Sequence, residues 1–396
     1  MKIGLIGNMN NNHFAMARYL RDRGFDATVL LTDREYPHFH PSADCIDGSH
    51  KVLCRQLAWG SAQSLRRVSG KCMANDLREF EVLVGCGLAP ACCKRAGRRL
   101  DVFIPYGGDL WEATMFRPCR PQNLVVAWGA ALAQRRGIAK VPVMHMSPVT
   151  MYERRLARLA PRSQRWKEGL PAVYHPMYEP GQMDPLLAAT PHAKRFLAVR
   201  SNCDLMLFSS VRHAWRLHPS DPNAKGTDRL LRALALVRSW RPGLRVRLVT
   251  MEYGEDVAAT KDLATELGIA DTFEWFPTMA RRELMAGLLL SDAACAEFET
   301  SYDSSGVIYE ALVAAKPLVM HRTDADYLPT APPGGLCPAL NGREPAEIAE
   351  RLLWVADHTA EAKSMGERGR TWYAEQVARR TLDRYEALLR GRGAGA

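Results

Sequence analysis

Short apolar segments alternate with helix-like segments along the whole chain, and this alternation limits the folds that the sequence can adopt. In the first half the apolar segments cover residues 2–7, 27–31, 81–84, 102–105 and 141–145. In the second half they cover residues 205–209, 245–249, 272–275, 293–296 and 318–320. Strands that alternate with helices are typical of β-α-β units around a parallel sheet. The pattern therefore predicts an α/β fold built twice.

The opening of the chain is the clearest of these units. Residues 2–7 read as a strand and 7–12 as a turn-rich loop, and Gly24 closes a helix over 14–23. Only Gly4 and Gly7 precede the asparagines, so the GxGxxG dinucleotide fingerprint is absent and a dehydrogenase is not expected. His13 at the loop–helix junction is a candidate to face a ligand, with a surface or capping role as the alternative.

The length of the chain predicts more than one core. A chain of 396 residues with 47% hydrophobic content can form two domains of roughly 170 to 200 residues each. Prolines at 171, 176 and 180 interrupt all periodicity, and we place a hinge there. We expect one domain at 1–175, a second at 176–375, and a C-terminal helix with a frayed tail at 376–396, the fraying beginning at residue 391.

Composition excludes several classes of protein. No run of eighteen apolar residues occurs, and the start MKIGLIGNMNNN lacks a signal-peptide core, so we expect a cytoplasmic protein, with peripheral contact at the inner face of the cell membrane left open. The ten cysteines show no CxxC pair or zinc spacing, which predicts reduced, mostly buried thiols and no metal.

The formal charge of +10 favours an acidic partner, such as a nucleotide phosphate, an anionic glycan or an anionic lipid surface. No basic run is interleaved with aromatic residues, so we expect no nucleic acid. The arginine-dense stretch 150–167 is a candidate contact for a membrane or a charged acceptor. Solvated arginine-rich helices are the alternative explanation of the charge.

The most informative stretch is 304–319, which reads as loop, helix and strand. Ser304, Ser305 and Gly306 precede the helix, where free backbone N–H groups and the positive dipole end suit a phosphate. Glu310 lies about one turn inside, where a carboxylate can accept two neighbouring hydroxyl protons of a ribose. The alternative is a capped helix with Glu310 on a solvated face.

In the first half, the strand end Tyr106-Gly107-Gly108-Asp109 is the expected place for chemistry, because ligands of open parallel sheets lie beyond the carboxyl ends of strands. Asp109 is a candidate to position an acceptor hydroxyl or to stabilise positive charge that develops on a sugar. Its alternative role is the cap of a helix over 110–114.

Arg212, the pair Lys225-Gly226 ahead of a helix, and the block from Gly306 through Glu310 to Pro317 resemble the donor half of retaining GT-B glycosyltransferases, especially glycosyltransferase family 4 (glycosyltransferase group 1). The resemblance implies two Rossmann-like domains that face each other across a cleft, with the acceptor-binding domain at 1–175 and the donor-binding domain at 176–375. It also implies that the Arg and Lys clasp the donor diphosphate and assist its departure, and that the Glu holds the ribose.

The sequence departs from this family at two positions. The family places an acidic residue eight positions before the ribose-binding Glu, where this chain has Tyr302, with Glu299 and Asp303 as nearby substitutes. The family's His-Gly-x-Asp motif has Tyr106 in place of its histidine.

The resemblance implies transfer of a sugar from a nucleotide-diphosphate-sugar donor to a hydroxyl of a glycan, a lipid-linked molecule or a small molecule, with retained anomeric configuration and no cofactor or metal. The sequence Asp324-Ala325-Asp326 is interpreted as a polar turn rather than a metal motif. Two alternatives stay open: a UDP-sugar epimerase of the same fold and a non-catalytic binding subunit.

Overall fold

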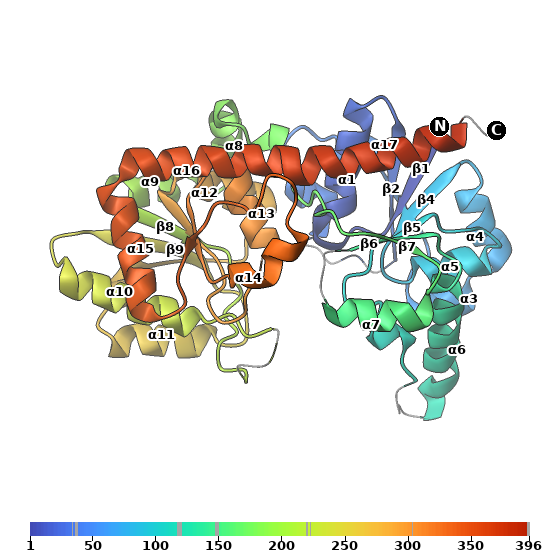
Figure 1. The fold of residues 1–396 in the computed structure, drawn as a ribbon, viewed down its shortest axis with the longest axis horizontal. Coiled ribbons are helices and arrows are strands. Elements are labelled where there is room, and N and C mark those ends of the chain that lie inside the picture. Colours follow the sequence, from blue (N-terminus) through green and yellow to red (C-terminus); the bar gives the residue numbers. More distant parts are fainter. Residues whose placement is uncertain are drawn as a thin grey trace. The chain divides into compact units, whose positions relative to one another are not determined.

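The computed structural model describes residues 1–33, 35, 39–116, 121–146, 150–218, 221, 223–302 and 304–393. The chain forms two compact units. Unit 1 consists of Met1–Tyr174 with Val377–Ala396, and unit 2 consists of His175–Gln376. Each unit contains a parallel sheet flanked by helices (Figure 1).

The described part of unit 1 has a seven-stranded sheet in the order β3-β2-β1-β4-β5-β6-β7. Its strands are β1 (Lys2–Ile6), β2 (Asp26–Leu31), β3 (Cys54–Gln56), β4 (Val82–Gly85), β5 (Val102–Phe103), β6 (Val143–His145) and β7 (Gln164–Trp166). Ile3 pairs with Ala27 on one side and with Val82 on the other, so β1 is central. β4 is buried along its whole length and β1 is buried from Ile3 to Ile6, and these buried residues are all apolar.

Helices cover both faces of this sheet and enclose the core of unit 1. They are α1 (Asn12–Asp22), α2 (His50–Leu53), α3 (Ala62–Arg67), α4 (Gly70–Leu77), α5 (Ala89–Arg95), α6 (Pro121–Ile138), α7 (Thr150–Leu159) and α17 (Arg380–Gly393). The core includes the fully buried Trp59, Phe103 and Met144. Tyr385 of α17 packs in the same unit, where its hydroxyl lies 3.1 Å from His145 Nδ1.

The described part of unit 2 has a six-stranded sheet in the order β10-β9-β8-β11-β12-β13. Its strands are β8 (Leu205–Ser209), β9 (Val246–Met251), β10 (Phe273–Phe276), β11 (Ala293–Cys295), β12 (Leu318–Met320) and β13 (Leu340–Asn341). Its helices are α8 (Met183–Ala188), α9 (Ala193–Ser201), α10 (Thr227–Trp240), α11 (Val257–Glu266), α12 (Arg281–Leu290), α13 (Gly306–Val313), α14 (Asp324–Tyr327), α15 (Pro345–Asp357) and α16 (Thr359–Trp372). A π-helical stretch, Tyr373–Arg379, leads from α16 towards α17.

The packing of unit 2 follows from its helix periodicity. In α10 the buried residues Leu230, Leu234 and Val237 recur at the spacing of one helix face and join β8 and β9 in one core. Pro345 is the first residue of α15, where a backbone N–H would form no hydrogen bond within the helix, so proline is tolerated there.

Several boundaries differ from the sequence prediction. The three shortest edge strands, β3, β7 and β13, were not predicted, because two or three residues carry no measurable period. The basic stretch 150–167 is a helix only to Leu159, since Pro161 ends it. The tail predicted to fray from residue 391 stays helical to Gly393, and residues 394–396 lie outside the described part.

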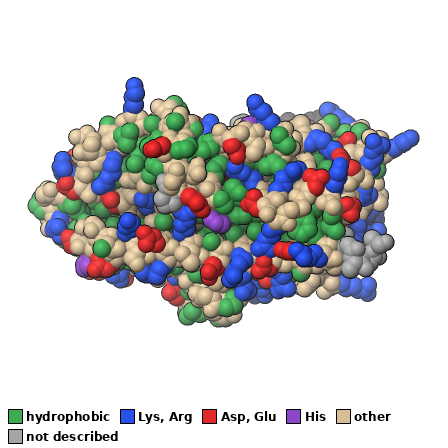
Figure 2. Space-filling view, turned by 90° about the horizontal axis from the view of Figure 1, so that it is seen from above, with side chains coloured by type: hydrophobic (Ala, Val, Ile, Leu, Met, Phe, Trp, Pro, Cys, Tyr) green, Lys and Arg blue, Asp and Glu red, His purple; other side chains and the backbone are tan. Residues whose placement is uncertain are grey.

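The surface is mixed in charge. On the face drawn in Figure 2, Lys and Arg side chains lie among Asp, Glu and hydrophobic side chains. Within the described residues, none of the helices is long and apolar enough to span a bilayer.

Candidate functional site

The topology of unit 2 places a switch point at the carboxyl edge of its sheet. β8 pairs with β9 on one side and with β11 on the other. The connections that leave β8 and β11 therefore run to opposite sides, and ligands of open α/β sheets bind at such a switch point. Arg212 and Lys225 lie in the connection from β8 to α10, and Glu297 follows β11.

Lys225 is held at this edge by its backbone and by its side chain. Its N–H donates to Ala214 O (2.8 Å), and its carbonyl accepts from Phe298 N (3.0 Å). The ammonium group lies 2.9 Å from Glu297 Oε1 and 5.1 Å from the centre of the Tyr302 ring. The side chains of Lys225 and Glu297 are only 16% and 9% exposed, so water screens this ion pair poorly.

The N-terminus of α10 has the properties of an anion site. Gly226 precedes it with φ +66°, and an added Cβ would lie 2.6 Å from Glu299 N, so the position requires glycine. As a glycine, Gly226 has no side chain with which to cap the helix. The buried Thr227 hydroxyl has no hydrogen-bond partner in the described part of the chain. Free backbone N–H groups, a free hydroxyl and Lys225 therefore gather at one helix end.

Glu297 is a site residue that the sequence analysis missed. It is 7% exposed, and its Oε2 atom finds no hydrogen-bond partner among the described residues. Burial raises the pKa of this carboxyl, and the charges of Lys225 and Arg212 only partly oppose the rise. A carboxylate with one free oxygen beside a lysine can bind a ligand hydroxyl or take up a proton.

The acidic substitutes considered for Tyr302 have different outcomes. Glu299 is occupied by ion pairs with Arg229 and Arg343, each at 2.9 Å. Asp303 lies outside the described residues. Tyr302 itself places its ring against Lys225 rather than supplying a carboxylate.

Arg212 is the second predicted cation of this edge. Its guanidinium lies at hydrogen-bond distance, 3.5 Å, from Asn223 Oδ1. Its charge also acts on Glu297, whose pKa it lowers. The structure therefore brings Arg212, Lys225 and Glu297 into one electrostatic group. The assigned roles of Arg212 and Lys225 stay predictions.

The stretch around α13 folds as loop, helix and strand, as predicted. Ser305 caps the helix by accepting from Ile308 N (3.4 Å). Ser304 lies in the preceding loop, and open space surrounds the α-carbon of Gly306. Both serines and Gly306 thus lie at the carboxyl edge, where a phosphate could approach the helix.

Glu310 is buried, so the alternative of a solvated face is wrong. Its Oε1 accepts from Arg281 Nε (3.1 Å) and its Oε2 from Ser210 Oγ (3.3 Å). Both side chains of the Arg281–Glu310 ion pair are less than 10% exposed. A ribose bound here would have to share these carboxylate oxygens with Arg281 and Ser210.

In unit 1, Asp109 ties two strand-end loops together. Its Oδ1 accepts from Tyr106 N (2.8 Å) and its Oδ2 from Gly87 N (3.0 Å). Burial raises the pKa of this carboxyl to about 6 against the lowering effect of these bonds. The alternative helix over 110–114 is only a short 3₁₀ turn, Glu112–Thr114, and Asp109 joins loops rather than capping it.

The other acceptor-side candidates lie around the ends of β1 and β5. His13 is fully buried, so the alternative of a surface role is wrong. Its Nδ1 lies 2.6 Å from Gly7 O and must carry the proton, and its Nε2 is without a partner in the described residues. Tyr106 OH accepts from Asn12 Nδ2 (2.7 Å). Burial lowers the pKa of His13 to about 4, so the ring is neutral near pH 7.

The two glycines of this strand end differ. Gly107 has φ +104°, a conformation that favours glycine. Gly108 is exposed, and an added Cβ would meet only Glu112 Oε2 at 3.9 Å. Gly107 thus shapes the turn, whereas Gly108 leaves room on its surface.

Among the described residues, no group of three or more His, Cys, Asp or Glu side chains could hold a metal ion. Asp324 and Asp326 lie in the short helix α14 rather than in a turn, and Asp324 pairs with Arg322 at 2.7 Å. The absence of a metal or cofactor from the reaction stays a prediction.

Known structures resemble the chain over nearly its full length. HepE of Anabaena, crystallised with UDP and glucose, has a TM-score of 0.59 at 15% identity, with 99% of this chain and 100% of HepE covered. A glycosyltransferase of Rickettsia africae has a TM-score of 0.60 at 11% identity, with 98% of each chain covered. No protein-family model matches the chain, and no curated protein matches it in sequence.

The same likeness extends to another class of enzyme. UDP-GlcNAc 2-epimerase of Neisseria meningitidis, bound to UDP-GlcNAc, has a TM-score of 0.53 at 13% identity, with 98% of this chain and 100% of the epimerase covered. At these identities the likeness shows the fold alone. The chain has the α/β architecture of GT-B proteins, with two parallel sheets.

Proposed function

We propose that the chain is a glycosyltransferase that moves a sugar from a nucleoside-diphosphate donor to an acceptor hydroxyl. The observation that carries this proposal is the carboxyl edge of unit 2. There Lys225, the uncapped N-terminus of α10 and the free Thr227 hydroxyl surround one position with donors. Such an arrangement suits a diphosphate.

The donor is held in unit 2. Arg212 and Lys225 bind the diphosphate, and the α10 and α13 N-termini add backbone N–H groups. Ser304, Ser305 and Gly306 admit the phosphates close to α13. Glu310, whose buried carboxylate lies 3.1 Å from Arg281 Nε, accepts the ribose hydroxyls. Uridine is the preferred base, on the analogy of the UDP complexes above.

The acceptor hydroxyl attacks the anomeric carbon from the face that the diphosphate leaves. The new carbon–oxygen bond forms as the bond to the diphosphate oxygen breaks, and the acceptor proton passes to that oxygen. The products are a glycoside of retained configuration and a nucleoside diphosphate. Arg212 and Lys225 neutralise the charge that develops on the leaving group, so no metal is required.

Unit 1 supplies the acceptor side. Asp109 positions the strand-end loops that carry Tyr106 and Gly87, and His13 lies at the adjacent end of β1. The acceptor is a glycan, a lipid-linked molecule or a small molecule. The assignment to family 4 and a role in polysaccharide biosynthesis belong to the same proposal.

Two other functions fit the fold. A UDP-sugar epimerase is favoured by the likeness to the Neisseria enzyme. A non-catalytic binding subunit would keep the nucleotide grip, and the replacement of the family's acidic residue by Tyr302 favours it. The first would change the donor without an acceptor, and the second would bind the donor without changing it.

A panel of nucleotide sugars, tested by thermal shift, identifies the donor, because a ligand that binds only the folded state raises the melting temperature. The selected donor is then incubated with acceptors, and the products are analysed by NMR for anomeric configuration, with and without EDTA. Transfer with retention in EDTA supports the proposal. Donor turnover without an acceptor supports the epimerase, and binding with neither reaction supports the subunit. A chain that binds none of the donors refutes all three.

A further inference from the structure

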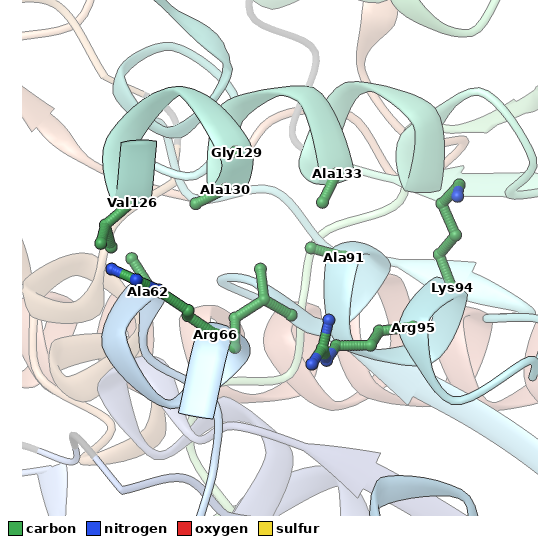
Figure 3. Close-up of a pocket in the computed structure, with 10 residues that line it drawn as sticks. Ala62, Arg66, Ala91, Lys94, Arg95, Val126, Gly129, Ala130 and Ala133 are labelled. Atoms are coloured by element: carbon green, nitrogen blue, oxygen red, sulfur yellow. The ribbon is translucent and has the colours of Figure 1, made fainter. Parts of the chain in front are cut away.

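A groove in unit 1 lies outside the candidate site. It runs between α3, α5 and α6 and has a volume of about 340 Å³ (Figure 3). Gly129, Ala130 and Ala133 of α6 line one wall, and Leu65 and Ala91 lie opposite. A second cavity of about 380 Å³ adjoins it, since Arg66 and Val126 line both. This surface, the α3–α6 groove, offers an apolar channel within the size range of ligand pockets.

The rim of the groove is cationic. Arg66 extends from α3, and Lys94 and Arg95 extend from α5 (Figure 3). The helices α3, α5 and α6 together contain six Lys or Arg residues and no Asp or Glu. Within the described part of the chain, Arg66, Lys94 and Arg95 form no ion pair with a carboxylate. Lys94 and Arg95 lie in the last turn of α5, where cations also stabilise the helix dipole. That role accounts for their charge, but it does not account for the apolar groove beside them.

Large apolar side chains are exposed on α6 and just before it, at positions other than those that line the groove. Trp128 and Leu132 of α6 are 46% and 40% exposed, and Met115 and Phe116 just before α6 are 42% and 45% exposed. The Phe116 and Trp128 rings meet edge to face at 5.8 Å, so they form one patch. Exposed aromatic and aliphatic residues next to cations are typical of a surface that lies in the headgroup region of a membrane.

We propose that the α3–α6 groove docks unit 1 on an anionic membrane by taking up one hydrocarbon chain of an anionic lipid. The apolar floor receives the chain, and Arg66, Lys94 and Arg95 meet the phosphate at its head. Trp128 and Leu132 enter the interface beside it. Charge complementarity selects this occupant, because an uncharged apolar ligand would leave three cations unmatched at the rim.

This surface replaces the basic stretch 150–167 as the membrane contact. In that stretch Arg155 donates to Thr114 Oγ1, and Arg165 donates to Ser163 O (2.7 Å) and Ala160 O (2.8 Å). Arg155 and Arg165 are therefore used inside unit 1. At the groove rim Arg95 Nε also donates to a backbone carbonyl, Val68 O (3.0 Å), whereas Arg66 and Lys94 line the opening.

Vesicle flotation with the full chain tests the proposal, and it needs neither a donor nor transfer activity. We expect binding to vesicles of phosphatidylcholine with phosphatidylglycerol and none to phosphatidylcholine alone. Each cation near an anionic surface strengthens binding about fivefold, so Arg66→Gln with Lys94→Gln should weaken it about thirtyfold. The charge-matched control, Arg232→Gln with Lys363→Gln in unit 2, should weaken it less than about threefold.

Gly129→Leu separates uptake of a chain from adsorption. Nothing lies within 4 Å of an added Cβ at Gly129, so leucine fills the groove without disturbing the fold. We expect about tenfold weaker binding, because the blocked chain loses its apolar contacts. Gly391→Leu in α17, which is equally open, should bind like the wild type. The proposal is overturned if the Gly129→Leu chain binds vesicles as well as or better than the wild type. It is also overturned if the charge-matched control loses as much binding as Arg66→Gln with Lys94→Gln, or if the wild type does not bind anionic vesicles.

Discussion

Glu297 should couple donor binding to the uptake of a proton. In the free protein its carboxylate lies 2.9 Å from the Lys225 ammonium, with the second oxygen buried and without a partner in the described residues. A diphosphate that contacts Lys225 would lie on the order of 5.5 Å from Glu297. At that distance two like charges repel by about 1 to 3 kcal/mol for an effective dielectric constant of 80 to 20.

The Glu297→Gln variant removes this repulsion while keeping the shape of the side chain. We therefore expect it to bind the donor about 5- to 150-fold more tightly at pH 8. The folded pKa of Glu297 is raised, so in the wild type donor affinity should increase as pH falls towards that pKa and the proton is taken up. In the variant this increase should disappear.

Isothermal titration in two buffers of different ionisation enthalpy measures both quantities. A nucleotide sugar is the suitable ligand, because its diphosphate diester does not titrate near neutral pH. Glu299→Gln is the matched control: Glu299 pairs with Arg229 and Arg343 rather than Lys225, so proton uptake should persist. The reasoning fails if Glu297→Gln binds no more tightly than the wild type at pH 8 and shows the same proton uptake.

Three further predictions concern the other site residues. Lys225→Ala and Arg212→Ala should each lower kcat/KM by about 100- to 1,000-fold, and undiminished turnover in both would remove them from the reaction. The melting temperature should stay unchanged in Arg212→Ala but fall in Lys225→Ala, because Glu297 loses its buried ion-pair partner. Glu310→Ala should weaken nucleotide binding and lower stability by about 3 to 5 kcal/mol in urea titration, because it breaks the buried ion pair with Arg281; unaltered affinity would contradict the ribose role. Asp109 has a folded pKa raised to about 6, so the stability it contributes is complete below about pH 4 and is lost as pH rises through 6. Asp109→Asn should flatten that part of the pH–stability curve, and an unchanged curve would show that this carboxyl does not titrate there.

Most elements of the fold could be predicted because their signal is local. The strands at 205–209 and 318–320 have the predicted bounds. In each of them hydrophobic residues recur over several positions and glycine, proline or serine lies nearby. The edge strand β13 has two residues and pairs only with β12, so it exists through its partner rather than through a pattern of its own.

The candidate site could be predicted only in part. Residues that lie next to a recognisable helix start, such as Gly226 and Ser305, were found from their neighbours in sequence. Glu297 was missed because it is marked as a site residue only by its ion pair with Lys225, which lies 72 positions earlier in the chain. The burial of His13 could not be predicted either, because nothing in the sequence around a histidine at the start of a helix shows that other loops will cover it.

By itself the sequence determined the alternation of strands and helices, the two-fold repetition of that alternation and the glycines that turns require, because these depend on steric preferences and periodicity over a few neighbouring residues. Only the tertiary structure decided which strands are adjacent, which carboxylate faces Lys225, and that three separate helices leave an open groove with a cationic rim. Those properties depend on chain segments that are distant in sequence and close in space, where burial and charge act over a few ångströms.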